Sequence, residues 1–163
     1  MEKTTHMWSS PNYCYTFSMI SKSPEETKKI AHSFAKKVVS HTDRALVVAL
    51  SGNLGSGKTT FAKAFAGAFG VHERGVTSPT FVIMKSHSLD SKRFPFKKFI
   101  HVDAYRLEKG EEMEKLGWDR LLEDPGNIIL IEWPENIGHI LPENAVKIFF
   151  SHIDENTREI VFN

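Results

Sequence analysis

The sequence predicts a three-layer α/β fold with a mainly parallel central sheet. Two short segments, Ala45–Leu50 and Ile128–Ile131, are apolar throughout, as strands buried on both faces of a parallel sheet are. Between the expected strands, apolar residues recur at four-residue spacing, which is typical of the buried side of a helix. At 163 residues the chain has the length of one ordinary domain. We therefore expect a single α/β domain.

The first expected elements are a strand and a capped helix. Tyr13–Ile20 alternates aromatic, apolar and hydroxyl residues and predicts a strand. Ser23 stands where a helix cap is expected, Pro24 follows at the first helical position, and Glu26 lies three residues after the serine. Together these residues predict a helix that continues to about Ser40.

A second helix is expected directly after the strand Ala45–Leu50 and its loop. Phe61, Phe65 and Phe69 are four residues apart, and Gly70 is suited to end the helix. The other expected elements are strands at Thr80–Met84, Phe99–Val102, Ile128–Ile131, Ala145–Phe150 and Glu159–Phe162, a loop at Lys85–Lys98 and a short helix at Glu111–Leu116.

Composition limits the classes of protein that need consideration. Lysine and arginine number 21 against 20 acidic residues, so the formal net charge of +1 argues neither for nor against a nucleic-acid partner. The single cysteine, Cys14, excludes an internal disulfide. Residues 1–12 are polar and predict a flexible tail without a secretory signal, before a domain at 13–163. No apolar run reaches the roughly 20 residues of a membrane span, and a cytoplasmic protein is expected.

The run from Gly52 to Thr59, G-N-L-G-S-G-K-T, matches the phosphate-binding pattern G-x-x-x-x-G-K-[ST]. Glycines let the backbone N–H groups of such a loop turn inward, and the following helix adds the positive end of its dipole. The Lys58 ammonium is expected at the β- and γ-phosphates, and the Thr59 hydroxyl at Mg²⁺. A chance glycine turn is the alternative, but the run lies between an apolar strand and an amphipathic helix, as the motif requires. The residues expected to contact nucleotide are Asn53, Leu54, Gly55, Ser56, Gly57, Lys58, Thr59 and Thr60.

Two acids follow apolar strands and are candidates for catalysis and metal binding. Asp103 follows Phe99–Val102, and Glu132 follows Ile128–Ile131. Ligands of open parallel sheets bind at the carboxyl ends of the strands, so both acids are expected to face the phosphates. One carboxylate would hold Mg²⁺ and the other would orient the attacking water. Spacing leaves open which acid meets the metal, and either could instead be a solvated strand end.

Three further motifs accompany the loop: Ser78–Phe81 (S-P-T-F), His101–Arg106 (H-V-D-A-Y-R) and Ile131–Glu135 (I-E-W-P-E). With the loop, their order and spacing resemble the TsaE (YjeE-type) ATPases of bacteria, from about Tyr13 to the C-terminus. Members of that family support formation of threonylcarbamoyladenosine next to the anticodon of tRNAs that read ANN codons. Their fold is a single P-loop NTPase domain.

The resemblance implies roles for individual residues. Asp103 is implicated in Mg²⁺ coordination together with Thr59, while Glu132 occupies the Walker B-like position and supports hydrolysis. Thr80 lies in a segment likened to a switch that senses the γ-phosphate. Trp133 is a further nucleotide-site residue. The implied ligands are ATP or ADP with Mg²⁺, and the implied partners are the TsaB and TsaD proteins, whose complex is reset by ATP hydrolysis.

Two other functions are compatible with a phosphate-binding loop. A small-molecule kinase usually needs an arginine-rich lid, but Arg120 is the only arginine between Glu111 and Asn144. A non-catalytic nucleotide-binding scaffold would not need both Asp103 and Glu132. Both alternatives are less well supported than an ATPase.

Two segments depart from the family pattern: the tail before Tyr13 and the stretch Lys85–Lys98 are both longer than in the usual core of the family. That stretch is basic and contains two phenylalanines, a mixture that can contact tRNA but is also typical of a solvated loop. His101 could carry a proton, although a histidine packed at a strand end is more often structural.

Overall fold

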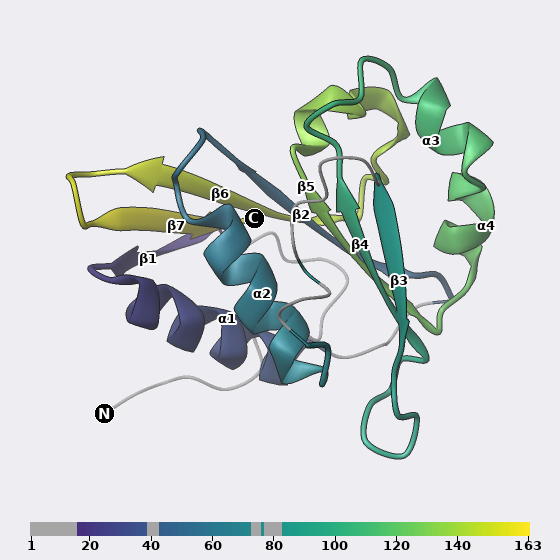
Figure 1. Cartoon of the computed structure of the whole chain (residues 1–163), viewed down its shortest axis with the longest axis horizontal. Helices are drawn as coiled ribbons and strands as arrows, with labels where there is room; N and C mark the ends of the chain where they lie inside the picture. Colours follow the sequence, from purple (N-terminus) through teal and green to yellow (C-terminus); the bar gives the residue numbers. More distant parts are fainter. Residues whose placement is uncertain (1–15, 39–42, 73–75, 77–82) are drawn as a thin grey trace.

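The computed structural model describes residues 16–38, 43–72, 76 and 83–163, and these residues form one seven-stranded sheet with helices on both of its faces (Figure 1). In chain order the elements are β1 Phe17–Ser21, α1 Pro24–Lys37, β2 Leu46–Gly52, α2 Lys58–Ala68, β3 Met84–Ser88, β4 Lys98–Asp103, α3 Glu111–Lys115, α4 Trp118–Glu123, β5 Asn127–Glu132, the 3₁₀ turns η2 Pro134–Asn136 and η3 Gly138–Ile140, β6 Val146–His152 and β7 Arg158–Phe162. None of the described helices is long and apolar enough to cross a membrane.

The sheet is mixed, with a parallel centre. Its strand order is β1-β7-β6-β2-β5-β4-β3. Strands β6, β2, β5 and β4 pair in parallel, and β5 is buried at every position. Antiparallel pairings add β7 and β1 at one side and β3 at the other. The predicted α/β fold with a mainly parallel central sheet is therefore confirmed: the four central strands, which carry the expected site, pair in parallel, and the outer three add antiparallel pairings.

Helix α1 begins where its sequence predicts. The Ser23 hydroxyl accepts the Glu26 N–H at 3.2 Å, and the Glu26 carboxylate accepts the Lys22 N–H at 2.7 Å, so two groups at the start of the helix are satisfied reciprocally. The helix ends at Lys37, because Val38 is already extended. The predicted end near Ser40 was too late.

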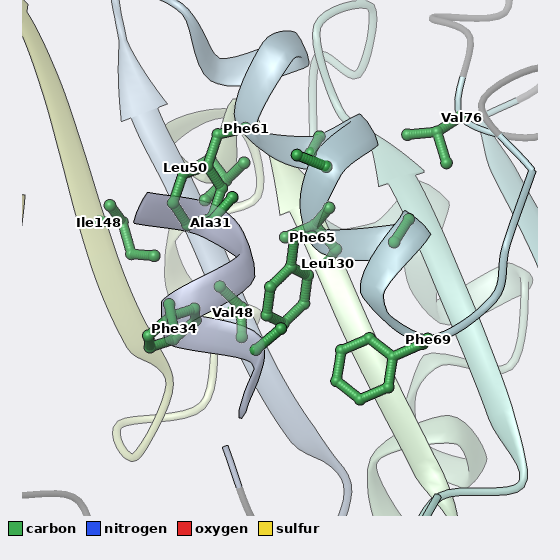
Figure 2. Close-up of a cluster of buried hydrophobic side chains, with 14 of the residues drawn as sticks. Ala31, Phe34, Val48, Leu50, Phe61, Phe65, Phe69, Val76, Leu130 and Ile148 are labelled. Carbon is green, nitrogen blue, oxygen red and sulfur yellow. The ribbon is translucent and has the colours of Figure 1, made fainter. Parts of the chain in front are cut away.

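Alternate residues of the strands supply two separate cores. The first core contains Val48, Leu50, Leu130 and Ile148 beneath α1 and α2, and these two helices add the phenylalanines Phe34, Phe61 and Phe65 (Figure 2). The second core packs Ile129 and Ile131 of the opposite sheet face against residues of α3 and α4, including the buried Trp118. Strands β2 and β5 are buried on both faces over most of their length, which explains why Ala45–Leu50 and Ile128–Ile131 are apolar throughout. The chain thus has helix, sheet and helix layers.

Two predictions around β3 were wrong in part. Lys85–Ser88 was expected to be loop, but it belongs to β3, which pairs with β4 in an antiparallel hairpin. An outer strand pairs on one side only and can keep polar residues, so M-K-S-H-S lacks the apolar signal of a central strand. Of the strand expected at Thr80–Met84, only Met84 is in β3, and residues 77–82 lie outside the described part of the chain.

The remaining elements differ from expectation at their ends. The first strand is Phe17–Ser21, and residues 1–15, including the predicted tail, are outside the description. The strand at Phe99–Val102, the helix at Glu111–Leu116 and the two C-terminal strands are confirmed within two residues at each end. Helix α4 was not predicted, because it has only 6 residues and too few turns to show a repeat.

Candidate functional site

The glycine-rich run forms the connection between β2 and α2. Three of its glycines have positive φ angles: 141° at Gly52, 75° at Gly55 and 103° at Gly57. A Cβ atom added to Gly52 would lie only 2.3 Å from the carbonyl oxygen of Phe150. The tight turn out of β2 therefore depends on glycine both for its backbone angles and for its approach to β6.

Lys58, the first residue of α2, turns its side chain back into this loop. Its ammonium donates to the carbonyl oxygens of Gly52 at 2.6 Å and Asn53 at 3.0 Å, and the residue is only 4% exposed. Burial lowers the pKa of Lys58 from its ordinary value, and the nearby carboxylates of Glu132, Glu135 and Asp103 oppose that shift. The structure thus concentrates one buried positive charge at the loop.

Trp133 lies directly beyond β5 and covers the lysine. The centre of its ring is 3.9 Å from the Lys58 ammonium. Its φ of 61° is the only positive φ of a non-glycine residue in the described ranges, a conformation that costs on the order of 1–2 kcal/mol. The backbone N–H of Trp133 donates to the Leu50 carbonyl at 3.2 Å, and this hydrogen bond links the strained residue to β2. Backbone strain of this kind points to a functional position.

Glu132 ends β5 and joins two parts of the site. It is 2% exposed, and its Oε2 accepts the Thr59 hydroxyl at 2.9 Å. Its Oε1 lies 2.9 Å from Nε2 of the equally buried His101. Thr59 follows Lys58 in the first turn of α2, so the buried Glu132 carboxylate links the end of β5 to the start of α2.

Asp103 is the register partner of Glu132 on the adjacent parallel strand. The two acids thus lie at the same edge of the sheet, as the sequence predicts. Asp103 is half-buried, and its Oδ1 accepts the Tyr105 N–H at 3.1 Å. The Asn136 amide then donates to the carbonyls of Ala104 at 2.8 Å and Tyr105 at 3.2 Å. These bonds fix the turn after β4 against η2.

The other loop residues differ in exposure. Leu54 is 79% exposed, and Asn53 and Gly55 are exposed as well. Ser56 is buried, and its hydroxyl has no hydrogen-bond partner among the described residues. Thr60 is half-buried on α2.

One contribution to the site was missed in the sequence, one was left open, and one expected residue is not described. The sequence allowed His101 a proton-carrying role but favoured a structural one, and Asn136 was not considered. The signal for His101 was its position two residues before Asp103 on the same strand face. Asn136 carried no signal, because its role depends on the turn that brings η2 back to β4. Thr80 lies outside the described residues.

These features define an α/β protein in which a glycine-rich loop, a buried lysine and two strand-end acids meet at the carboxyl edge of a parallel sheet. Residues 21–160 match the protein family described as threonylcarbamoyl adenosine biosynthesis protein TsaE. The chain belongs to the TsaE family, and it is therefore a protein needed for threonylcarbamoyladenosine modification of tRNA.

Similar proteins agree over most of the chain. The tRNA threonylcarbamoyladenosine biosynthesis protein TsaE of Bacillus subtilis is 38% identical over 139 residues, which cover 85% of this chain and 80% of that protein. Its counterpart in Rickettsia felis is 34% identical over 140 residues, 86% of this chain and 75% of that protein. The crystal structure of Bacillus subtilis YdiB superposes with a TM-score of 0.67 at 30% identity, covering 91% of this chain and 84% of that one.

Proposed function

We propose that this chain is a P-loop ATPase, the ATP-binding and ATP-hydrolysing subunit of the machinery that makes threonylcarbamoyladenosine. The observation that carries the proposal is the start of α2. This 11-residue helix has Gly57 as its N-cap, no side chain caps it, and its first turn contains no acid. Free N–H groups and the helix dipole at such an end favour an anion.

The loop also contains groups suited to phosphate oxygens. The Ser56 hydroxyl is buried without a partner in the described residues, and the Lys58 ammonium is held at the loop by two backbone carbonyls. An unsatisfied hydroxyl and a buried cation both cost free energy, which a bound triphosphate would recover. The nucleotide-contacting set proposed from the sequence, Asn53 to Thr60 with Trp133, fits this arrangement.

Mg²⁺ fits the residues at the strand ends. When bound to nucleotide, this ion neutralises the charge that develops on the transferring phosphoryl group. The described residues hold no cluster of three or more His, Cys, Asp or Glu side chains able to bind a metal alone. Sites that share the ion with phosphate need only one or two carboxylates. We propose that Thr59 and Asp103 hold it.

The hydrogen bond from Thr59 to Glu132 supports these roles. Because the Thr59 hydroxyl hydrogen points toward Glu132 Oε2, the lone pairs of the hydroxyl oxygen remain available to a cation. Glu132 contacts one of the two residues that would hold the metal, and from there it would orient the attacking water or accept its proton. Lys58 would stabilise charge on the phosphates, and Thr80 would sense the γ-phosphate.

The partners proposed are TsaB and TsaD, in the cytoplasm. Because the chain is one small domain with its site at an open sheet edge, we expect slow hydrolysis alone and faster hydrolysis when partners complete the site. tRNA contact through the Lys85–Lys98 hairpin stays a prediction. The turn of this hairpin precedes Lys98, the first residue of β4, whereas Asp103 is the last residue of that strand. The turn therefore lies at the opposite end of β4 from the candidate site.

The direct test measures phosphate release from Mg-ATP by the purified chain alone, with TsaB and TsaD, and with tRNA added. We expect weak turnover alone, stimulation by the two proteins, and their co-purification with the chain in the presence of ATP. Absence of both Mg-ATP binding and hydrolysis in folded protein would reject the proposal. Turnover that appears only with a small-molecule acceptor would instead identify a kinase.

A further inference from the structure

A buried histidine–carboxylate pair lies behind the proposed site. His101 on β4 and Glu132 on β5 are each 2% exposed, and Nε2 of one is 2.9 Å from Oε1 of the other. The register partner of His101 is Leu130, so the imidazole reaches diagonally along the sheet to Glu132. Both side chains lie on the sheet face that α2 covers, since Leu130 belongs to the core beneath that helix.

Each oxygen of the Glu132 carboxylate has a different partner. Oε2 accepts the Thr59 hydroxyl, and Oε1 contacts His101. A carboxylate removed from water needs such donors, because an unpaired buried charge costs several kcal/mol. An ionised carboxylate only accepts hydrogen bonds, so a hydrogen bond to it at Oε1 requires the His101 tautomer that carries its hydrogen on Nε2. Two donors from two different elements therefore fix the orientation of the carboxylate.

We propose that His101 is a positioning residue for Glu132: by holding Oε1, it keeps Oε2 turned toward Thr59. This inference rests on the proposed ATPase function and assigns His101 no contact with nucleotide or metal. Among the described residues, no hydrogen bond to Oε1 other than that of the imidazole is found. Without it, the carboxylate would rotate or share the Thr59 hydrogen between its two oxygens, and Glu132 and Thr59 would lose their fixed geometry.

A histidine suits this place better than a longer cation. The surrounding sheet face carries Phe99 and Leu130, and a neutral imidazole costs less to bury there than an ammonium or a guanidinium. Its ring is also rigid once one nitrogen is bonded. Residues that orient a functional carboxylate or histidine in this way typically contribute about 10- to 100-fold to activity.

The test compares three variants of the full chain in the presence of TsaB and TsaD. His101→Phe removes the donor but keeps the ring volume, His101→Gln keeps an amide N–H near the Nε2 position, and His87→Phe is the control. His87 lies on the neighbouring strand β3, opposite Phe99, and its buried Nε2 has no partner among the described residues.

We expect His101→Phe to lower kcat about 10- to 100-fold with KM and Mg-ADP affinity changed less than about threefold. His101→Gln should recover most of kcat, and His87→Phe should match wild type. Full activity in His101→Phe, or a loss that His101→Gln does not restore, would overturn the inference. A general defect in folding would appear as lost Mg-ADP binding.

A second measurement needs no hydrolysis. In nucleotide-free, ¹⁵N-histidine-labelled protein, NMR should show His101 protonated at Nε2, with a slowly exchanging imidazole proton that Glu132→Gln shifts and Asp103→Asn leaves in place. An Nε2 without that proton, or a signal indifferent to Glu132→Gln, would refute the pairing whether or not the chain is an ATPase. If the signal behaves as expected but no ATP turnover is found, the proposed function fails and the pairing stands.

Discussion

The ammonium of Lys58 lies 3.9 Å from the centre of the Trp133 ring. The two residues come from different elements, Lys58 from the start of α2 and Trp133 from the turn after β5. Hydrogen bonds position both residues. The Lys58 ammonium donates to loop carbonyls, and the backbone N–H of Trp133 donates to the carbonyl of Leu50 on β2. A cation against an aromatic face is stabilised by on the order of 0.5–2 kcal/mol.

The first prediction follows from this contact. A phosphate that draws the Lys58 ammonium away from the indole should change the tryptophan fluorescence of the protein. We expect Mg-ADP to change the emission of wild type, and Trp133→Phe to abolish most of that change. Trp118→Phe should keep it, because Trp118 is buried in the second core and donates to Ile140. An unaltered fluorescence change in Trp133→Phe would show that the Trp133 indole does not respond to nucleotide binding.

Lys58→Ala should remove the charge on which the proposed phosphate binding depends. Charge-assisted hydrogen bonds contribute about 1.5–3 kcal/mol, so Mg-ADP affinity should fall by about 10- to 100-fold or more. Lys63→Ala changes another lysine of α2, beyond its first turn, and this matched control should bind normally. Isothermal titration calorimetry measures both. Equal heats and affinities for Lys58→Ala and wild type would contradict the placement of phosphate at this loop.

Glu132→Gln should impair turnover more than binding. The amide keeps the volume of the carboxylate but loses its charge and basicity, so kcat should fall by about 10²- to 10⁴-fold. Mg-ADP affinity should change by less than about threefold. Glu135→Gln alters an exposed acid three residues later and serves as the control. Steady-state ATPase assays with the partner proteins decide the point, and an unchanged kcat in Glu132→Gln would exclude its proposed role.

The pKa of Lys58 predicts a pH effect on stability. Burial lowers the pKa of its ammonium in the folded protein below the ordinary 10.5, so the unfolded chain holds this proton more tightly. Stability therefore rises with pH between the folded and unfolded pKa values. Urea unfolding measures the free energy of unfolding of wild type and of Lys58→Met at increasing pH. The free energy of wild type should rise relative to that of the variant as the pH approaches 10.5. Movement in the opposite direction would mean that Lys58 binds its proton more tightly when folded.

Ser23→Ala tests the start of α1. Loss of the hydroxyl that accepts the Glu26 N–H should lower the free energy of unfolding by about 1 kcal/mol. Ser33→Ala changes an exposed serine within the same helix and should have a much smaller effect, measured by urea unfolding. If the two variants are equally stable, the cap contributes nothing measurable.

The elements that were predicted correctly are those whose signals lie within a short stretch of sequence. The central strands β2 and β5 were found because both of their faces are buried, and α1 was found because its cap, proline and acids are adjacent in sequence. The outer strand β3 was mistaken for a loop, since pairing on one side leaves its residues polar. Its partner β4 begins ten residues after β3 ends, and only the hairpin between them reveals the strand.

The members of the candidate site were easier to predict than their contacts. Lys58, Thr59, Asp103 and Glu132 were predicted from the loop motif and the strand ends, and the structure brings them together. That Thr59 bonds to Glu132 depends on the position of α2 relative to β5, which no spacing specifies. The diagonal step from His101 to Glu132 likewise depends on strand register. Side-chain pairing across elements is a property of the assembled sheet and cannot be predicted from either segment alone.

Helix α2 carries Lys58 and Thr59 in its first turn, whereas Phe61 and Phe65 in the following turns have no exposed surface. The loop-facing end of this helix is consequently anchored to the first core through the side chains of Phe61 and Phe65. A substitution that repacks either phenylalanine is therefore expected to displace the Lys58 ammonium and the Thr59 hydroxyl, although it changes no group at the candidate site itself.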